Sequence, residues 1–204
     1  MLYELTIFGI KPNQLGPVLA ILPDSVPAAS KNGRLLGCFT CELGVLNRIA
    51  ILAAYPDAHA IQAHRAALLD RGDLYGVTQH LASFDRATFQ PFPFMSDIEP
   101  GAYGPFYEIR SYGLAAGGLA DTSEAWGKVF ERRNQISKLL MVMSSLDTVP
   151  MRMVHLWPYR SLDERMAARA QGSKEGIWPP PGGSGHLLSL QSDIFLPTAF
   201  SPLK

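Results

Sequence analysis

The segment LYELTIFGIKPNQL at residues 2–15 returns later in the chain as FYEIRSYGLAAGGL at residues 106–119. The shared residues stand 104 positions apart: Tyr3 and Tyr107, Glu4 and Glu108, Gly9 and Gly113, Leu15 and Leu119. The same offset relates NRIAILAAY (47–55) to MRMVHLWPY (151–159), and the dipeptide Arg-Ala at 65–66 to that at 169–170. One offset that holds over three separated stretches indicates a duplicated unit of about one hundred residues.

Each copy has the pattern of a βαββαβ unit, which is the ferredoxin-like arrangement. The S-x-x-E pattern at Ser161 predicts the start of the last helix, and Asp121, followed by a glutamate three residues later, predicts the start of the helix before it. Asp57 is expected to cap the second helix of the first copy. The first helix of that copy is expected to be short or broken, because three prolines interrupt its sequence: Pro17, Pro23 and Pro27.

Central strands such as RIAILAAY (48–55) and RMVHLWPY (152–159) carry apolar groups on both faces, so both faces should be buried. A ferredoxin-like unit covers one face of its sheet with helices and leaves the other bare. We therefore expect an α+β fold of two tandem units, residues 1–100 and 106–204, whose bare antiparallel sheets pack on each other as a sandwich or barrel. The segment FPFMSDIEPGAYGP (92–105) is the expected connector.

The composition argues against two classes of partner and does not choose between a binding protein and an enzyme. The 204 residues include 18 Lys plus Arg and 18 Asp plus Glu, so the formal net charge is zero, which argues against a general nucleic-acid or polybasic membrane binder. No apolar run reaches the roughly 20 residues that span a bilayer. The sequence enters a strand-like stretch at once, with no pattern of a signal peptide, and a cytoplasmic location is expected.

Neither a metal nor a cofactor is predicted. Cys38 and Cys41 form C-F-T-C within strand-like sequence, where a spacing of three sends the thiols to opposite faces and no second pair of ligands is placed to complete a zinc site. The histidines of the first copy, His59 and His64, are five apart, which does not suit two ligands on one helix face. The stretch GGSG (182–185) follows three prolines and is interpreted as a flexible loop.

Alternate positions of the segment 151–159 place aromatic and polar side chains on one face of a strand. Two interpretations remain open. The face is a pocket wall between the sheet and its helices, with a histidine as acid, base or ligand contact near neutral pH, or it is packed core. If a pocket exists, the residues expected to line it are His155, Trp157 and Tyr159 with Asn47 or Glu42, and with Tyr55 as the duplicated counterpart of Tyr159.

Several charged residues have two interpretations each. Arg132 and Arg133 stand late in a helix, where they either bind an anion or, as we expect, form part of a solvated helix end. Glu4 and Glu108 share one repeat position, either as paired carboxylates or in a common strand-edge role. Arg48 and Arg152 also share a position, where each meets either a ligand or a partner carboxylate.

Several motifs, in order along the chain, resemble the NIPSNAP family. They are CELGVLNRI (41–49), YEIRSY (107–112), HLWPYRSLDERMAARA (155–170), Trp178 and LQSDIFLPTAFSPL (190–203). The resemblance implies the fold of dimeric α–β barrel proteins, formed here within one chain by the two copies. It implies little about activity.

Two classes of function follow from these observations. The first is a binding or interaction protein that takes a small apolar or aromatic ligand. The alternative is a small-pocket enzyme of the α–β barrel type, like a cofactor-free oxygenase or isomerase, which rests on fold analogy. Whether the protein is an enzyme stays open, and a homodimer or higher homo-oligomer is expected because symmetric dimers are the commonest oligomers.

Overall fold

The computed structural model describes residues 1–29 and 32–204 and contains two successive βαββαβ units. The first comprises β1 (Leu2–Ile10), α1 (Leu15–Ala29), β2 (Arg34–Leu43), β3 (Arg48–Tyr55), α2 (Ala58–Asp70), the 3₁₀ helix η1 (Thr78–His80) and β4 (Leu81–Pro91). The second comprises β5 (Phe106–Leu114), α3 (Leu119–Ile136), β6 (Met141–Ser145), β7 (Met151–Tyr159), α4 (Leu162–Lys174) and β8 (Leu187–Pro197). The α+β fold of two ferredoxin-like units is confirmed.

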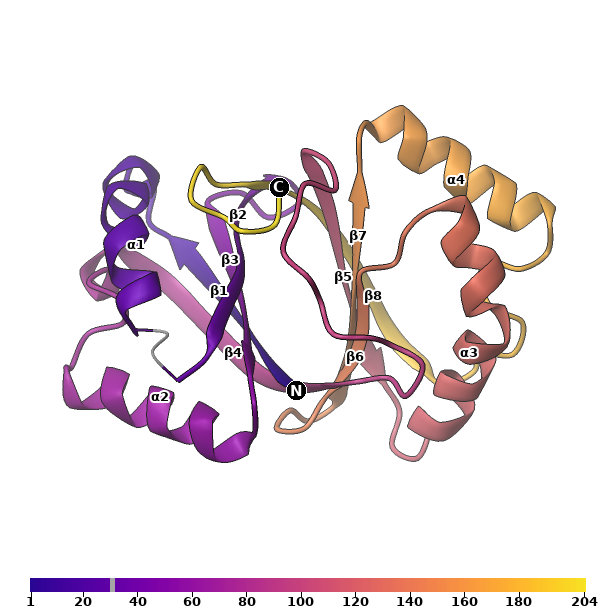
Figure 1. Cartoon of the computed structure of the whole chain (residues 1–204), viewed down its shortest axis with the longest axis horizontal. Helices are drawn as coiled ribbons and strands as arrows, with labels where there is room; N and C mark the ends of the chain where they lie inside the picture. The colour runs from indigo at the N-terminus through magenta and orange to yellow at the C-terminus, as the bar shows by residue number, and fades with distance from the viewer. Residues whose placement is uncertain (30–31) are drawn as a thin grey trace.

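The strands close into one antiparallel barrel in the order β1-β3-β2-β8-β5-β7-β6-β4. Each unit contributes four consecutive strands of this order, and the helices α1 and α2 cover one side while α3 and α4 cover the opposite side (Figure 1). Hydrogen-bonded pairing of β2 with β8 and of β4 with β6 joins the units at two seams. The seams are short, because Phe89–Pro91 is the only part of β4 that pairs with β6 among the described residues.

Two of the ion pairs that cross between the units involve the arginines that share one repeat position. Arg48 of the first unit lies 2.6 Å from Asp193 of the second, and Arg152 of the second reaches Asp85 of the first at 2.5 Å. Arg48 and Arg152 therefore meet carboxylates of the opposite unit, which was one of the two interpretations open from the sequence.

Strand alternation divides the buried side chains between the barrel interior and two outer layers. The interior core draws on both units, with Phe39 and Phe89 from the first and Tyr107, Leu156 and Phe195 from the second. Separate apolar clusters lie between each half of the barrel and its own pair of helices. Both faces of the central strands are buried, as their sequences indicate.

The prediction of a short or broken first helix is wrong. α1 runs for 15 residues with Pro23 and Pro27 inside it. Its residues Val18, Leu22 and Val26, spaced by four, are fully buried against the first half of the barrel. An interior proline costs about 3 kcal/mol of helix stability, and the packing of this apolar face outweighs that cost.

The predicted helix starts are right at two positions and wrong at one. Asp57 accepts a hydrogen bond from the Ala60 amide at 2.9 Å, and Ser161 accepts one from the Glu164 amide at 3.0 Å, so both cap their helices. α3 instead begins after Gly118, and Asp121 lies in its first turn. None of the helices in residues 1–29 and 32–204 is long and apolar enough to cross a membrane.

Candidate functional site

A cavity of about 240 Å³ lies on the helix-covered side of the second unit. β5 supplies Arg110 and Tyr112, α3 supplies Trp126, and α4 supplies Arg169. The segment after α4 and the start of β8 complete the lining with Trp178, Pro179, Pro180, Gly183, Ser184, Leu187 and Leu190. The segment expected to be a flexible loop thus forms a wall of the cavity.

Aromatic rings pack edge to face around this cavity. Trp126 and Trp178 have ring centroids 4.7 Å apart at an angle of 81°, and Trp178 also contacts Trp157 at 5.4 Å. Tyr112 and Trp126 each approach His155 at 4.8 Å. Such contacts stabilise the packing of the wall beyond the burial of apolar area.

His155 lies fully buried on β7 beneath these rings. Its Nδ1 accepts a hydrogen bond of 2.6 Å from the indole Nε1 of Trp157, which can only donate, so the imidazole proton resides on Nε2. Nε2 has no hydrogen-bond partner among the described residues. Burial, together with the charges of Arg110, Arg169 and Arg133, holds the pKa of His155 well below its usual range. His155 is therefore a neutral donor, and it does not accept a proton near neutral pH.

Arg133 is buried rather than part of a solvated helix end, so the expectation is wrong for Arg133, whereas Arg132 is exposed as expected. Its guanidinium carbon lies 4.4 Å from the ring centre of Trp157 and 5.2 Å from that of Trp178. The residue is 2% exposed, and desolvation lowers its pKa. A cation between two indole faces gains a cation–π attraction that a solvated arginine lacks, which offsets the cost of burial.

Glu108 is the buried carboxylate of this layer. It accepts hydrogen bonds from Arg165 at 2.7 Å and Arg110 at 3.1 Å, and the hydroxyl of Ser192 donates to it as well. Although burial opposes its ionisation, these donors lower the pKa of Glu108, so it is charged at neutral pH. Glu4, its counterpart in the first unit, accepts from Arg65 Nε at 2.6 Å. The two carboxylates are not paired with each other, and each binds the arginine of a covering helix.

The family model named NIPSNAP matches residues 3–94 and 107–202, once for each unit. The chain belongs to the NIPSNAP family. A NipSnap homolog of Dictyostelium discoideum is 24% identical over 210 residues, which cover 96% of this chain and 86% of the relative.

Solved structures of low sequence identity share the fold of this NIPSNAP chain. A protein of Fusobacterium nucleatum described as a candidate monooxygenase is 11% identical, with a TM-score of 0.70 over 96% of this chain and 91% of its own. An anthrone oxidase-like protein is 12% identical, with a TM-score of 0.71 over 97% and 91%. These likenesses confirm the dimeric α–β barrel fold within one chain.

The structure brings together three of the residues that the sequence predicts to line a pocket. His155, Trp157 and Tyr159 lie side by side on β7 in the layer under α3 and α4, but they are buried behind the wall of the cavity and none of the three lines it. Tyr55 is buried in the other unit, where it packs beside His64 of α2 at 5.5 Å. The outer layers of the two units lie on opposite sides of the barrel, so the tyrosines 104 positions apart do not share a pocket (Figure 1).

The two remaining predicted residues lie away from the cavity. Glu42 is exposed near the end of β2, and Asn47 is exposed in the turn before β3 with a left-handed φ of 55°. Asparagine tolerates this conformation better than most residues, which gives Asn47 a local role in the turn.

Sequence reasoning missed several residues that line or support the cavity: Arg110, Tyr112, Trp126, Arg169 and Trp178. A signal was present in the comparison of the two copies at the offset of 104. Thr6, Ile51 and Ala53 of the first copy correspond to the larger or more polar Arg110, His155 and Trp157 of the second. The outer face of the second unit has therefore diverged from that of the first.

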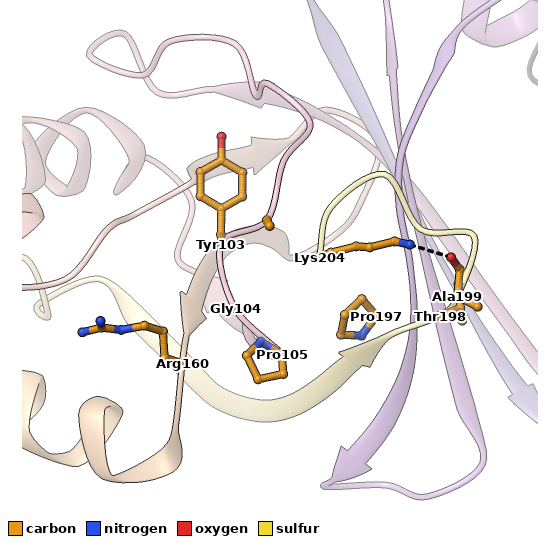
Figure 2. A pocket seen from close by; sticks show the side chains of 9 residues that line it. Tyr103, Gly104, Pro105, Arg160, Pro197, Thr198, Ala199 and Lys204 are labelled. Carbon is orange, nitrogen blue, oxygen red and sulfur yellow. Dashed lines mark hydrogen bonds between the residues drawn. The ribbon is translucent and has the colours of Figure 1, made fainter.

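A second cavity, of about 580 Å³, is more open and lies between the connector and the residues after β8. Both charged side chains of its lining already have partners. Lys204 Nζ donates to the carbonyl of Ala199, which also lines the cavity, at 2.7 Å (Figure 2). Arg160 pairs with Glu164. Tyr103 extends away from the two prolines that border the cavity. We therefore place the candidate site in the aromatic cavity of the second unit.

Proposed function

We propose that this NIPSNAP protein binds a small organic ligand in the aromatic cavity of its second unit. The observation that carries the proposal is the lining of this cavity of about 240 Å³, which combines the rings of Tyr112, Trp126 and Trp178 with the side chains of Arg110 and Arg169. Apolar walls with few polar groups are typical of small-molecule sites.

The geometry supports binding over proton transfer by His155. Its Nδ1 is occupied by Trp157, and its pKa lies well below the usual range, so it is a poor general base. The enzymatic alternative, a cofactor-free oxygenase or isomerase, rests on the fold alone, and no contact in the cavity favours it over binding.

Trp126 and Trp178 line this cavity and Trp157, the third tryptophan of the protein, packs against Trp178, so tryptophan fluorescence reports on the cavity. We expect a member of a panel of small aromatic compounds to quench this fluorescence and to raise the melting temperature. Ser184→Phe, which adds a ring to the cavity lining, should abolish both effects. The control is Leu188→Phe, which adds a side chain of the same size at an exposed position outside the lining. If no compound binds, or if Ser184→Phe binds as well as the wild type, the proposal is wrong.

The setting we propose is a cytoplasmic homodimer or higher homo-oligomer that binds neither nucleic acid nor a bilayer. The zero net charge supports the absence of a polyanionic partner. Cys38 and Cys41 are free thiols, as proteins in a reducing compartment have. We also propose that residues 1–100 and 106–204 form the two units of the chain and that the ligand site belongs to the second unit.

A further inference from the structure

The charge around the aromatic cavity is unbalanced. Four arginines lie in the layer between the second half of the barrel and its helices: Arg110, Arg133, Arg165 and Arg169. Among residues 1–29 and 32–204, Glu108 is the one carboxylate within ion-pair distance of any of them. The cavity lining includes two of these arginines and no acidic residue among the described side chains. Several cations sharing one buried carboxylate are costly in a region of low dielectric constant, and a bound anion offsets that cost.

The two copies show how this imbalance arose. Arg65 of α2 and Arg169 of α4 occupy the same repeat position. In the first unit, Arg65 binds Glu4 at 2.6 Å and Asp147 at 3.2 Å, so its charge is neutralised.

In the second unit, the corresponding carboxylate is Glu108, which forms an ion pair with Arg165. Arg165 lies one helical turn before Arg169. The position of Arg165 is occupied in the first unit by Ile61, a buried apolar residue. The exchange of isoleucine for arginine therefore releases Arg169 from its carboxylate. The released side chain lines the cavity, where a ligand can reach it.

We propose that the ligand is a small aromatic carboxylate, held by Arg169 and Arg110 with its ring among Tyr112, Trp126 and Trp178. This inference rests on the proposed function and names its ligand class. The planar guanidinium of arginine matches a carboxylate with two parallel hydrogen bonds. Indole and phenol rings supply an apolar surface for a planar ring. The volume of about 240 Å³ is below that of sites for drug-sized molecules and suits one or two fused rings.

The test compares a charged probe with its neutral analogue. We expect 2-naphthoate to bind the wild-type protein in isothermal titration calorimetry at least tenfold more tightly than 2-naphthamide, which has a similar size and no charge. Arg169→Gln should weaken the binding of 2-naphthoate by about 10- to 100-fold, the effect of losing a charged hydrogen-bond donor. The same variant should change the dissociation constant of 2-naphthamide by no more than about twofold, because the neutral amide forms no ion pair with Arg169.

Two control variants separate recognition from general effects. Arg65→Gln changes the same repeat position in the first unit and should leave 2-naphthoate binding unchanged. Arg132→Gln changes an exposed arginine of α3 that pairs only with Glu175 among the described residues, and should also leave it unchanged. If either control weakens binding as much as Arg169→Gln does, the assignment of Arg169 is wrong.

The outcomes also separate this inference from the proposed function. If the acid and the amide bind equally and Arg169→Gln affects neither, anion recognition is wrong while a small-ligand site remains. If neither probe nor any uncharged aromatic compound of the panel binds, both proposals fail.

Discussion

At the scale of single residues, burial determines which side chains carry chemistry. His155, Arg133 and Glu108 are each at most 2% exposed, and each has a shifted pKa whose direction follows from its partners. Glu108 keeps its charge because several donors surround it, whereas His155 has no carboxylate partner and stays neutral. At a similar degree of burial, Glu108 is therefore an anion and His155 is a neutral hydrogen-bond donor.

The neutral state of His155 predicts a pH dependence of stability. An unfolded histidine has a pKa of about 6.5, and the folded pKa is lower, so below that pH the unfolded state binds one more proton. The contribution of neutral His155 to the free energy of unfolding is complete above pH 6.5. It is lost as the pH falls, by up to about 1.4 kcal/mol per pH unit. Urea unfolding between pH 5 and 8 should show this slope in the wild type and a shallower one in His155→Gln. Parallel curves for the two proteins would show that His155 is not held neutral.

At the scale of single elements, the duplicated helices begin in matching ways. Asp57 and Ser161 stand 104 positions apart and cap α2 and α4 with the same hydrogen bond. Helix α3 has no side-chain cap, since Gly118 precedes it. The caps fix where α4 begins, and thereby position Arg165 and Arg169 along the cavity.

Ser161→Ala should lower the free energy of unfolding by about 1 kcal/mol, because the amide of Glu164 loses its acceptor. Ser161→Asp restores an acceptor, as Asp57 provides in α2, and should keep most of the stability. Urea unfolding of both variants measures the difference. Equal losses in the two variants would mean that the hydrogen bond to Glu164 does not stabilise the helix.

At the scale of the whole molecule, the two units share one interior core and two short seams. Arg48 and Asp193 are both largely buried beside one of these seams. A double-mutant cycle with Arg48→Met and Asp193→Asn should therefore give a coupling energy of about 1–3 kcal/mol in favour of the native pair. A coupling near zero would show that the seam does not depend on this ion pair.

The shared core also predicts that the units unfold together. All three tryptophans lie in the second unit, so fluorescence follows that unit while far-ultraviolet circular dichroism follows both. The two signals should give one coincident urea transition, the test of a single cooperative fold. Separate midpoints would contradict the proposed packing of 1–100 against 106–204.

The edges of the barrel support the expected homodimer. Leu188 and Leu190 of β8 are 63% and 65% exposed where the strand extends past its pairing with β2, and Phe84 of β4 is exposed in the corresponding region. Apolar edge strands without covering groups favour pairing with another chain. Light scattering should give twice the chain mass of 22.3 kDa, and Leu188→Lys, which lies outside the cavity lining, should reduce it to one chain. A wild-type monomer at high concentration would contradict the expectation.

The sequence by itself determined the duplication, the order of strands and helices, the caps at Asp57 and Ser161, and the family. These features rest on local patterns, namely side-chain periodicity, capping residues and a constant offset, which act over a few residues and can be read without coordinates. The face that carries His155, Trp157 and Tyr159 was predictable for the same reason.

Only the tertiary structure decided the chemistry of the cavity. Glu108 binds Arg165, while Arg169 has no carboxylate within ion-pair distance among the described residues. Arg133 is buried with its guanidinium over the rings of Trp157 and Trp178. Trp178 reaches the cavity through a proline- and glycine-rich segment whose course is set by packing and not by periodicity. These relations join residues far apart in the sequence. Their energies depend on burial and on competition for one carboxylate, and neither quantity exists until the chain has folded.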